Sequence, residues 1–194
     1  MKYSLIILSV FTVACSQAQQ PASSNKTADI PEKYIGIPVT EEDYNYPVQL
    51  SEDEWKERLS DEAYHILREE GTERPFTSSF NDNKKKGTYY SAATGQPLFS
   101  SETKFDSGTG WPSFYQPISE KAVVLREDGG LGMTRIEVED SGSGSHLGHV
   151  FSDGPEPTGL RYCMNGGAMI FVAEGEEPPA LVKEYLAANP DEKP

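Results

Sequence analysis

From Gly87 onward, the chain is built of short apolar runs separated by glycines and other turn residues. Runs of this length between turn signals are typical of β-strands, in which side chains point alternately to opposite faces. We predict strands over residues 88–91, 122–125, 131–138, 148–151, 160–163 and 168–172. The pattern predicts a mainly β (α+β) domain with antiparallel pairing.

Two short helices are predicted ahead of this region. Ser51, followed three residues later by Glu54, has the form of a capping box, which predicts a helix running to about Leu59. A second helix is predicted over residues 60–67, with a serine as its N-cap. A further short helix is predicted over residues 180–188, near the C-terminus.

The first 47 residues are assigned to an export signal and to a tether and extended segment that precede the folded domain. Residues 1–18 have the charged start and apolar centre of an export signal. The apolar stretch is shorter than the roughly 20 residues of a membrane-spanning helix. Residues 19–47 are expected to form a tether and an extended segment, and the folded domain is assigned to residues 48–190.

The end of the signal can be interpreted in two ways. The segment Thr12-Val13-Ala14-Cys15 resembles a bacterial lipoprotein signal, in which Cys15 becomes the lipid-modified first residue, although Thr12 stands where leucine is usual. The small residues Ser16 and Ala18 also suit ordinary cleavage after Ala18. Either route predicts an exported protein of the bacterial cell envelope. It would lie in the periplasm or be attached to a membrane only through a lipid on Cys15.

The formal net charge of the chain is -14, with 17 Lys and Arg against 31 Asp and Glu. Binding to nucleic acid needs a basic surface, so this charge excludes that class of function. The short basic run Lys84-Lys85-Lys86 is interpreted as a solvated loop. We expect a monomer.

The chain has two cysteines, Cys15 and Cys163. Because Cys15 lies at the end of the export signal, it is either removed or modified, and Cys163 remains as the single free thiol. Exported proteins with a structural disulfide framework carry several cysteines in even number. Cys163 is therefore free to react.

Alternation along residues 160–165 predicts the surroundings of this thiol. If the segment is extended, Arg161, Cys163 and Asn165 share one face, and the apolar side chains between them share the core face. The guanidinium group would favour the thiolate, which is the nucleophilic form. The alternative interpretation is a small cysteine buried in an ordinary strand.

Two histidines precede this strand, His146 and His149. In a regular strand they would point to opposite faces, but Gly148 between them allows a turn or bulge that aims both at one pocket. A zinc site is the rival interpretation. Two histidines and one cysteine without a CxxC pair make a poor closed zinc site, so no metal is expected. A structural histidine at a strand end is the third alternative.

Trp111 lies in a loop with glycines at positions 108 and 110 and a proline directly after it. Tryptophan is often a core residue, and that alternative stays open. A stiff loop of this kind is also a common way to present an aromatic wall to a small apolar group.

Four motifs of the chain resemble one family. They are residues 71–76 (GTERPF), 105–114 (FDSGTGWPSF), 145–154 (SHLGHVFSDG) and 159–165 (GLRYCMN). In this order they are similar to the B-class methionine sulfoxide reductases, which repair the R epimer of methionine sulfoxide. The resemblance spans about residues 50–172. It implies a fold of two antiparallel sheets with helices at the N-terminal side.

The resemblance also implies roles for residues near the thiol. Cys163 matches the catalytic nucleophile of the family. His146, His149 and Asn165 match the residues that surround the sulfoxide.

Four further residues are assigned to substrate binding and support. Trp111 matches the indole that contacts the substrate methyl group, and Phe151 is predicted to bind substrate beside it. Arg161 and Asp153 match a charged pair that supports the cysteine.

The chain departs from the family pattern at three places. Residues 91–94 and 140–143 stand where many members carry two CxxC pairs that bind structural zinc. Thr109 stands where many members carry a resolving cysteine. Gly166 replaces a residue that is usually serine, which puts the fine positioning of the site in question.

The resemblance predicts an oxidoreductase, a peptide-methionine (R)-S-oxide reductase, that acts on oxidised proteins or on free methionine sulfoxide. No bound cofactor is expected, and the sulfenic acid formed on Cys163 would be reduced by an external thiol, either a thioredoxin-like protein or a small thiol. Two other classes stay open at this point: a Cys-His acyl-transfer hydrolase, and a binding module that recognises oxidised methionine without turnover.

Overall fold

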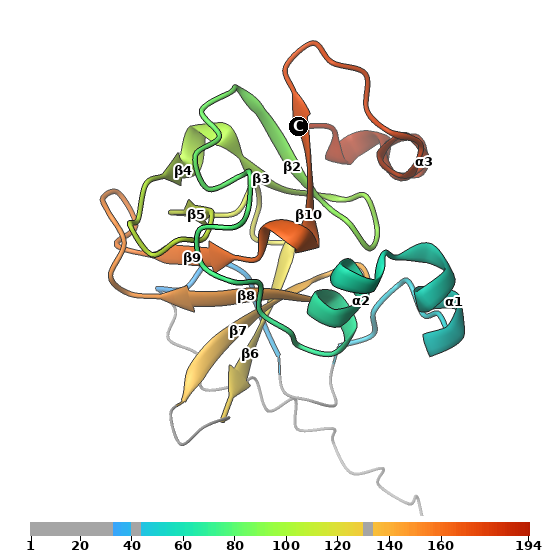
Figure 1. Cartoon of the computed structure of the whole chain (residues 1–194), viewed down its shortest axis with the longest axis horizontal. Coiled ribbons are helices and arrows are strands. Elements are labelled where there is room, and N and C mark those ends of the chain that lie inside the picture. The colour runs from blue at the N-terminus through green and yellow to red at the C-terminus, as the bar shows by residue number, and fades with distance from the viewer. Residues whose placement is uncertain (1–32, 40–43, 130–133) are drawn as a thin grey trace, which may run out of the picture.

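The computed structural model of the chain describes residues 33–39, 44–129 and 134–194. Within these ranges the protein is mostly β, with two sheets and three α-helices (Figure 1). The prediction of a mainly β fold with two sheets and a short C-terminal helix is confirmed. The predicted export signal, Cys15 and the first part of the predicted tether lie outside the described residues.

The large sheet has seven strands in the order β1-β6-β7-β8-β9-β5-β4. Along the chain, these strands are β1 (Ile37–Pro38), β4 (Lys104–Phe105), β5 (Ser113–Phe114), β6 (Val123–Asp128), β7 (Arg135–Asp140), β8 (His146–Phe151) and β9 (Arg161–Met164).

Pairing in the large sheet is antiparallel except at one edge. There β1 runs parallel to β6, and the backbone N–H of Val39 donates to the carbonyl of Leu125 at 3.0 Å. The predicted antiparallel pairing therefore does not hold for this pair. The N-terminal segment lies along the outer edge of β6, whose backbone groups would otherwise have no strand partner on that side.

The small sheet has three antiparallel strands in the order β10-β2-β3. These strands are β2 (Gly87–Ser91), β3 (Pro97–Ser100) and β10 (Met169–Ala173). Strand β3, like β1, β4 and β5, was not predicted. Three of these four strands have only two residues, which is too short for an alternating pattern to be visible.

Helices α1 (Glu52–Arg58) and α2 (Asp61–Arg68) form where the two serine caps predict them. The carboxylate of Glu54 accepts a hydrogen bond from the backbone N–H of Ser51 at 2.8 Å, and the Ser51 hydroxyl accepts one from the N–H of Glu54 at 3.4 Å. The hydroxyl of Ser60 accepts from the N–H of Ala63 at 3.2 Å. These caps satisfy backbone donors that the first turn leaves unpaired.

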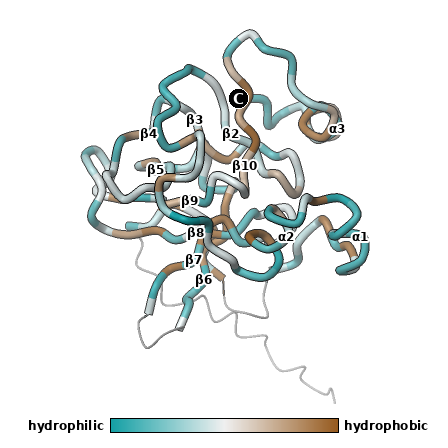
Figure 2. The backbone as a smooth tube through the Cα atoms, in the orientation of Figure 1, coloured by the Kyte–Doolittle hydropathy of each residue, from teal (hydrophilic) through white to brown (hydrophobic). Residues whose placement is uncertain are grey.

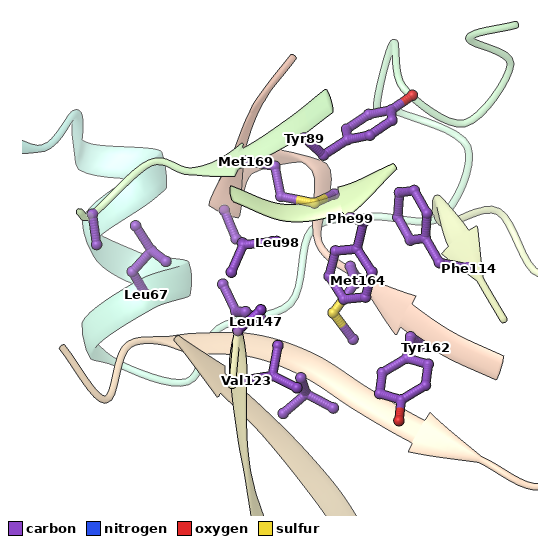
Figure 3. Close-up of a cluster of buried hydrophobic side chains, with 14 of the residues drawn as sticks. Leu67, Tyr89, Leu98, Phe99, Phe114, Val123, Leu147, Tyr162, Met164 and Met169 are labelled. Carbon is purple, nitrogen blue, oxygen red and sulfur yellow. The ribbon is translucent and has the colours of Figure 1, made fainter. Parts of the chain in front are cut away.

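One hydrophobic core joins the two sheets and α2. Figure 3 shows Leu67 of α2 facing Leu98 of the small sheet and Leu147 of the large sheet. Aromatic rings fill the centre, where Phe99 stacks on Phe114 with ring centroids 4.5 Å apart. Because this core packs against one face of β8 and β9, their other face is left for a site.

The outer face of the small sheet is covered by α3 (Ala180–Ala188). Tyr90, Val172 and Val182 form a second buried cluster there. Figure 2 shows hydrophobic residues along both β10 and α3. Among the described residues, no helix is long and apolar enough to cross a membrane.

Candidate active site

Strand β9 presents Cys163 as the sequence predicts. Leu160, Tyr162 and Met164 are almost fully buried in the core, whereas Arg161 and Cys163 are only partly buried. The alternation of β9 therefore turns the thiol away from the core. The thiol is free and lies in a partly open position, so the interpretation of a cysteine buried in an ordinary strand is wrong.

A pocket of about 150 Å³ opens above the thiol. It is lined by Thr72, Trp111, Arg135, Gly148, His149, Phe151, Cys163 and Asn165. Five of the predicted site residues thus meet in one cavity with mostly apolar walls, together with three residues that were not assigned to the site.

The two histidines reach one region because β8 is irregular. Val138 pairs with Gly148, but the next residue of β7, Glu139, pairs with His146, so β8 has one additional residue at Leu147. As a result the rings of His146 and His149 lie with their centroids 5.4 Å apart. The bulge predicted next to Gly148 is present and brings the two imidazoles close together, but the prediction that both face one pocket is wrong for His146, which does not line it.

His149 lines the pocket directly opposite the thiol. It pairs with Cys163 across β8 and β9. Its Nε2 lies 3.0 Å from Asp128 Oδ2, and the same carboxylate oxygen lies 2.6 Å from Arg135 Nη2. Burial lowers the pKa of His149 below its ordinary value, although the hydrogen bond to Asp128 works against this shift.

His146 lies deeper, with 4% of its surface exposed, and does not line the pocket. Its Nδ1 lies 2.5 Å from Glu137 Oε1, which fixes the orientation of the ring. Within the described residues, its Nε2 is buried and has no hydrogen-bond partner. His146 therefore supports the pocket from beneath, next to His149.

Arg161 and Asp153 form the predicted charged pair beside the thiol. The guanidinium nitrogens Nε and Nη2 each donate to one carboxylate oxygen of Asp153 at 2.9 Å. The guanidinium also lies over the ring of Phe151, 4.3 Å from its centroid. Although burial opposes the charged form, Asp153 and Cys163 raise the pKa of Arg161 and keep it cationic next to the sulfur.

Trp111 is held against the segment that follows α2. Its indole N–H donates to the carbonyl of Glu73 at 3.1 Å, and the N–H of Glu73 donates to the side-chain oxygen of Asn165 at 3.1 Å. Asn165 is 3% exposed and also donates through its amide nitrogen to the carbonyl of Leu147 at 3.1 Å. In Figure 1 this segment runs from α2 past the end of β8 and β9.

The position of Gly166 has a structural reason. The backbone N–H groups of Gly166 and Gly167 donate to the carboxylate of Glu73 at 2.7 and 3.0 Å. A Cβ at Gly166 would lie only 1.9 Å from the hydroxyl oxygen of Ser78. A larger residue would therefore displace either Ser78 or the Glu73 carboxylate, so glycine fits the site of this chain.

Residues 91–94 and 140–143, for which the resemblance implies CxxC pairs in many family members, meet around the buried carboxylate of Asp140. Its oxygens accept hydrogen bonds from the hydroxyl of Ser91, from the hydroxyl of Thr94 at 2.8 Å and from the N–H of Gly142 at 2.6 Å. We call this cluster the Asp140 network. Among the described residues, no group of three or more His, Cys, Asp or Glu side chains is placed to hold a metal ion.

Thr109 contacts the thiol from the loop before β5. Its Oγ1 lies 3.8 Å from Cys163 Sγ, within hydrogen-bond reach for sulfur. The same oxygen lies 2.8 Å from the hydroxyl of Ser107, which is itself 2.8 Å from the hydroxyl of Ser113. The residue at the position for which the resemblance implies a resolving cysteine in many family members thus lies next to the free thiol in this chain.

Five residues of the site were missed by sequence reasoning: Thr72, Glu73, Asp128, Arg135 and Glu137. One signal was available for two of them. Arg135, Glu137 and Glu139 alternate with apolar residues in β7, so that the three charged side chains share one face of the strand. Because the other predicted strands are mainly apolar, this charged face indicates a polar site.

Replacing Gly148 by alanine should damage both the fold and the site. A Cβ there would lie 2.2 Å from the carbonyl oxygen of Cys163, so β8 and β9 would have to separate. We expect a loss of about 2–3 kcal/mol in the free energy of unfolding. The measurement is urea unfolding of G148A beside G175A, because Gly175 also has positive φ but nothing within 4 Å of its Cβ. Equal losses in the two variants would contradict the predicted clash.

Comparison with known proteins places the chain in a family. A family model described as the SelR domain matches residues 59–173, which is more than half of the chain. The peptide methionine sulfoxide reductase MsrB of Methanosarcina barkeri (strain Fusaro) is 59% identical over 129 residues, covering 66% of this chain and 91% of that protein. The protein of the same name from Leptospira interrogans is 52% identical over 130 residues, covering 67% and 99%. That from Agrobacterium fabrum is 53% identical over 124 residues, covering 64% and 92%. The free thiol, the paired imidazoles and these similarities agree, and the chain belongs to the SelR-domain family of B-class peptide methionine sulfoxide reductases.

Proposed function

We propose that the protein reduces the R epimer of methionine sulfoxide, free or in proteins, to methionine, through a sulfenic acid on Cys163. The observation that carries the proposal is the position of the free thiol. It opens into a small pocket walled by Trp111, with His149 directly across the strand pair. A nucleophile, a group that can carry a proton and an apolar wall are the three parts that this reaction needs.

In the first step the thiolate of Cys163 attacks the electrophilic sulfur of the sulfoxide. The oxygen is transferred from the substrate sulfur to Cys163, with one proton added, so that methionine leaves and the thiol becomes a sulfenic acid. The substrate is reduced by two electrons, and the cysteine sulfur is oxidised by two. The guanidinium of Arg161, which interacts with Cys163, places a positive charge beside the attacking sulfur.

The sulfoxide oxygen must be protonated as its bond to sulfur breaks. We assign this proton to His149, because His149 lines the pocket whereas His146 does not. Asp128 holds the Nε2 side of the ring at 3.0 Å. Asn165, which also lines the pocket, would orient the substrate, and the buried pair of His146 and Glu137 would hold His149 in place from beneath.

Trp111 and Phe151 would select the substrate by shape. Both line the pocket, and the indole is fixed by its hydrogen bond to Glu73. The methyl group of the sulfoxide would pack on the indole ring while the oxygen faces His149. A sulfur of opposite chirality cannot satisfy both contacts in the same orientation, which is the basis for the proposed preference for the R epimer.

The second half of the reaction needs an external thiol. Cys163 is the one cysteine among the described residues, and Thr109, next to it, cannot form a disulfide. An external thiol, from a thioredoxin-like protein or a small molecule, attacks the sulfenic sulfur and releases water. A second thiol then attacks the mixed disulfide and restores Cys163.

We further propose that the protein acts outside the cytoplasm, in the cell envelope. The support for this location is the charged and apolar start of the sequence, which ends at Cys15 or Ala18. Mass spectrometry of the mature N-terminus distinguishes the alternatives: a lipid on Cys15, cleavage after Ala18, or an unprocessed chain, which would contradict the proposal.

The test of the function is an epimer-resolved assay of the purified chain with dithiothreitol. We expect methionine to form from the R epimer and very little from the S epimer. Consumption of the S epimer at a similar rate would contradict the proposed selectivity. Binding of methionine sulfoxide without methionine product would instead indicate a binding module, and turnover of a panel of acyl substrates would indicate a hydrolase.

The hydrogen bond between Asp128 and His149 predicts a specific titration. The carboxylate of Asp128 opposes the lowering effect of burial on the pKa of His149. In D128N we therefore expect the pKa of His149 to fall further below its ordinary value. An NMR titration of the imidazole resonances measures it. D153N is the matched control, because Asp153 pairs with Arg161 rather than with His149. An unchanged or raised His149 pKa in D128N would contradict the assignment.

A further inference from the structure

The loop that carries Thr109, together with the first residue of β5, contains a row of hydroxyl groups that ends at the sulfur of Cys163. The Ser113 hydroxyl lies 2.8 Å from that of Ser107, the Ser107 hydroxyl lies 2.8 Å from that of Thr109, and the Thr109 oxygen lies 3.8 Å from Cys163 Sγ. Ser113 is fully buried and pairs with Cys163 in the register of β5 and β9. We refer to these three residues as the hydroxyl row.

We infer that Thr109 donates a hydrogen bond to the sulfur of Cys163 and, as the last member of the hydroxyl row, stabilises its ionised, nucleophilic form. The inference deepens the proposed function and rests on it for the role of Cys163. It assigns a positioning role to the residue that stands where many relatives carry a resolving cysteine.

The chemistry of the groups fixes the direction of the hydrogen bonds. An ionised sulfur can only accept, so the Thr109 hydroxyl must donate to it. The oxygen of Thr109 is then available to accept from Ser107, and that of Ser107 to accept from Ser113. Hydrogen bonds that point the same way along a row polarise one another and strengthen the last one.

The hydroxyl row can also accept a hydrogen bond from the neutral thiol, because Ser113 has a second acceptor at the other end of the row. The hydroxyl of Ser113 lies 3.1 Å from the backbone carbonyl of Trp111, which can only accept. When Cys163 carries its proton, the S–H group can donate to Thr109 and each hydroxyl can point toward this carbonyl. When the thiol loses its proton, the three hydroxyl groups rotate so that each donates toward the sulfur, and no heavy atom has to move.

Other groups near the sulfur carry charge, and Arg161 also has a side-chain hydrogen-bond interaction with Cys163. Arg161 of β9 interacts with Cys163, and His149 of β8 and Arg135 of β7 share its pocket. The loop itself carries Asp106, whose carboxylate accepts from the N–H of Gly108 at 3.1 Å. These four groups stay unchanged in the variants below, so a difference between variants reports on the hydroxyl row.

The test is the rate at which iodoacetamide alkylates Cys163, measured from pH 5 to pH 10, roughly. We expect T109V, which replaces the hydroxyl by a methyl group, to react about three- to tenfold more slowly at neutral pH. Its profile should also have its midpoint at higher pH. T109S keeps the hydroxyl and should stay within about twofold of the original chain.

A third variant, S113A, removes the hydroxyl farthest from the sulfur. The midpoint of its alkylation profile should also lie at higher pH than in the original chain, but by a smaller amount than in T109V. S113A carries the test if T109V does not fold. Superimposable profiles for the original chain and the folded T109V, or equal displacement in T109S and T109V, would overturn the inference. An unchanged S113A profile would overturn the role of the row.

Alkylation needs no sulfoxide, so this result is independent of the reductase assay. A displaced T109V profile in a chain that fails to produce methionine would contradict the proposed function and leave the hydrogen bond standing. Normal methionine production together with unchanged alkylation profiles would instead contradict the hydrogen bond from Thr109 and leave the proposed function standing.

Discussion

Replacing Cys163 by serine should abolish the reduction of methionine sulfoxide. A hydroxyl group is a far weaker nucleophile than a thiolate, and the described residues contain no second thiol that could take its place. We expect turnover to fall by more than about 10⁴-fold, the scale on which removal of a nucleophile acts in other enzymes. The measurement is methionine formation from the R epimer with excess dithiothreitol.

Two controls make this result specific. The thiol is only partly buried and a serine hydroxyl is smaller than a thiol, so C163S should keep the circular dichroism spectrum and the urea midpoint of the original chain. C15S removes the other cysteine of the sequence and should keep full activity in the purified chain. Substantial methionine formation by C163S would end the proposed mechanism.

Replacing Asp140 by alanine should lower the free energy of unfolding more than any other substitution proposed for this chain. The side chain is fully buried, and its removal leaves the hydroxyls of Ser91 and Thr94 and the N–H of Gly142 without their acceptor. Each orphaned buried donor costs about 1–3 kcal/mol, so the free energy of unfolding should fall by at least about 3 kcal/mol. Because the Asp140 network is not part of the pocket lining, the folded fraction should still reduce methionine sulfoxide.

Urea unfolding followed by tryptophan fluorescence measures this change. D153A is the matched control, because the Asp153 side chain is 64% exposed and its ion pair with Arg161 should contribute less than about 1 kcal/mol. A loss in D140A no larger than that in D153A would show that water or neighbouring groups replace the acceptor.

The residues that could be predicted are those whose positions follow from local rules. The two-residue period of a strand is enough to place Cys163 and Arg161 on the face opposite Tyr162, and the burial of Tyr162 in the core agrees with it. The freedom of Gly148 to accommodate a bulge predicts that His146 and His149 can meet.

The residues that were missed act through partners far apart in the chain. Asp128 and Glu137 become the partners of His149 and His146 only because the hairpin of β6 and β7 lies beside β8. Glu73 reaches Asn165 across 92 positions of sequence. Local patterns hold no information on such pairings, and the parallel contact of β1 with β6 was missed for the same reason.

The Asp140 network has a consequence for a protein whose substrates are made by oxidants. Thiolate ligands of a metal are attacked by the same reagents that damage methionine, and their loss would loosen the scaffold together with the chemistry. Carboxylate and hydroxyl oxygens are inert to those reagents. Under the proposed mechanism, an oxidant can therefore stop turnover at Cys163 while the Asp140 network stays intact. As long as the sulfur goes no further than the proposed sulfenic acid, recovery requires a supply of electrons and no new synthesis.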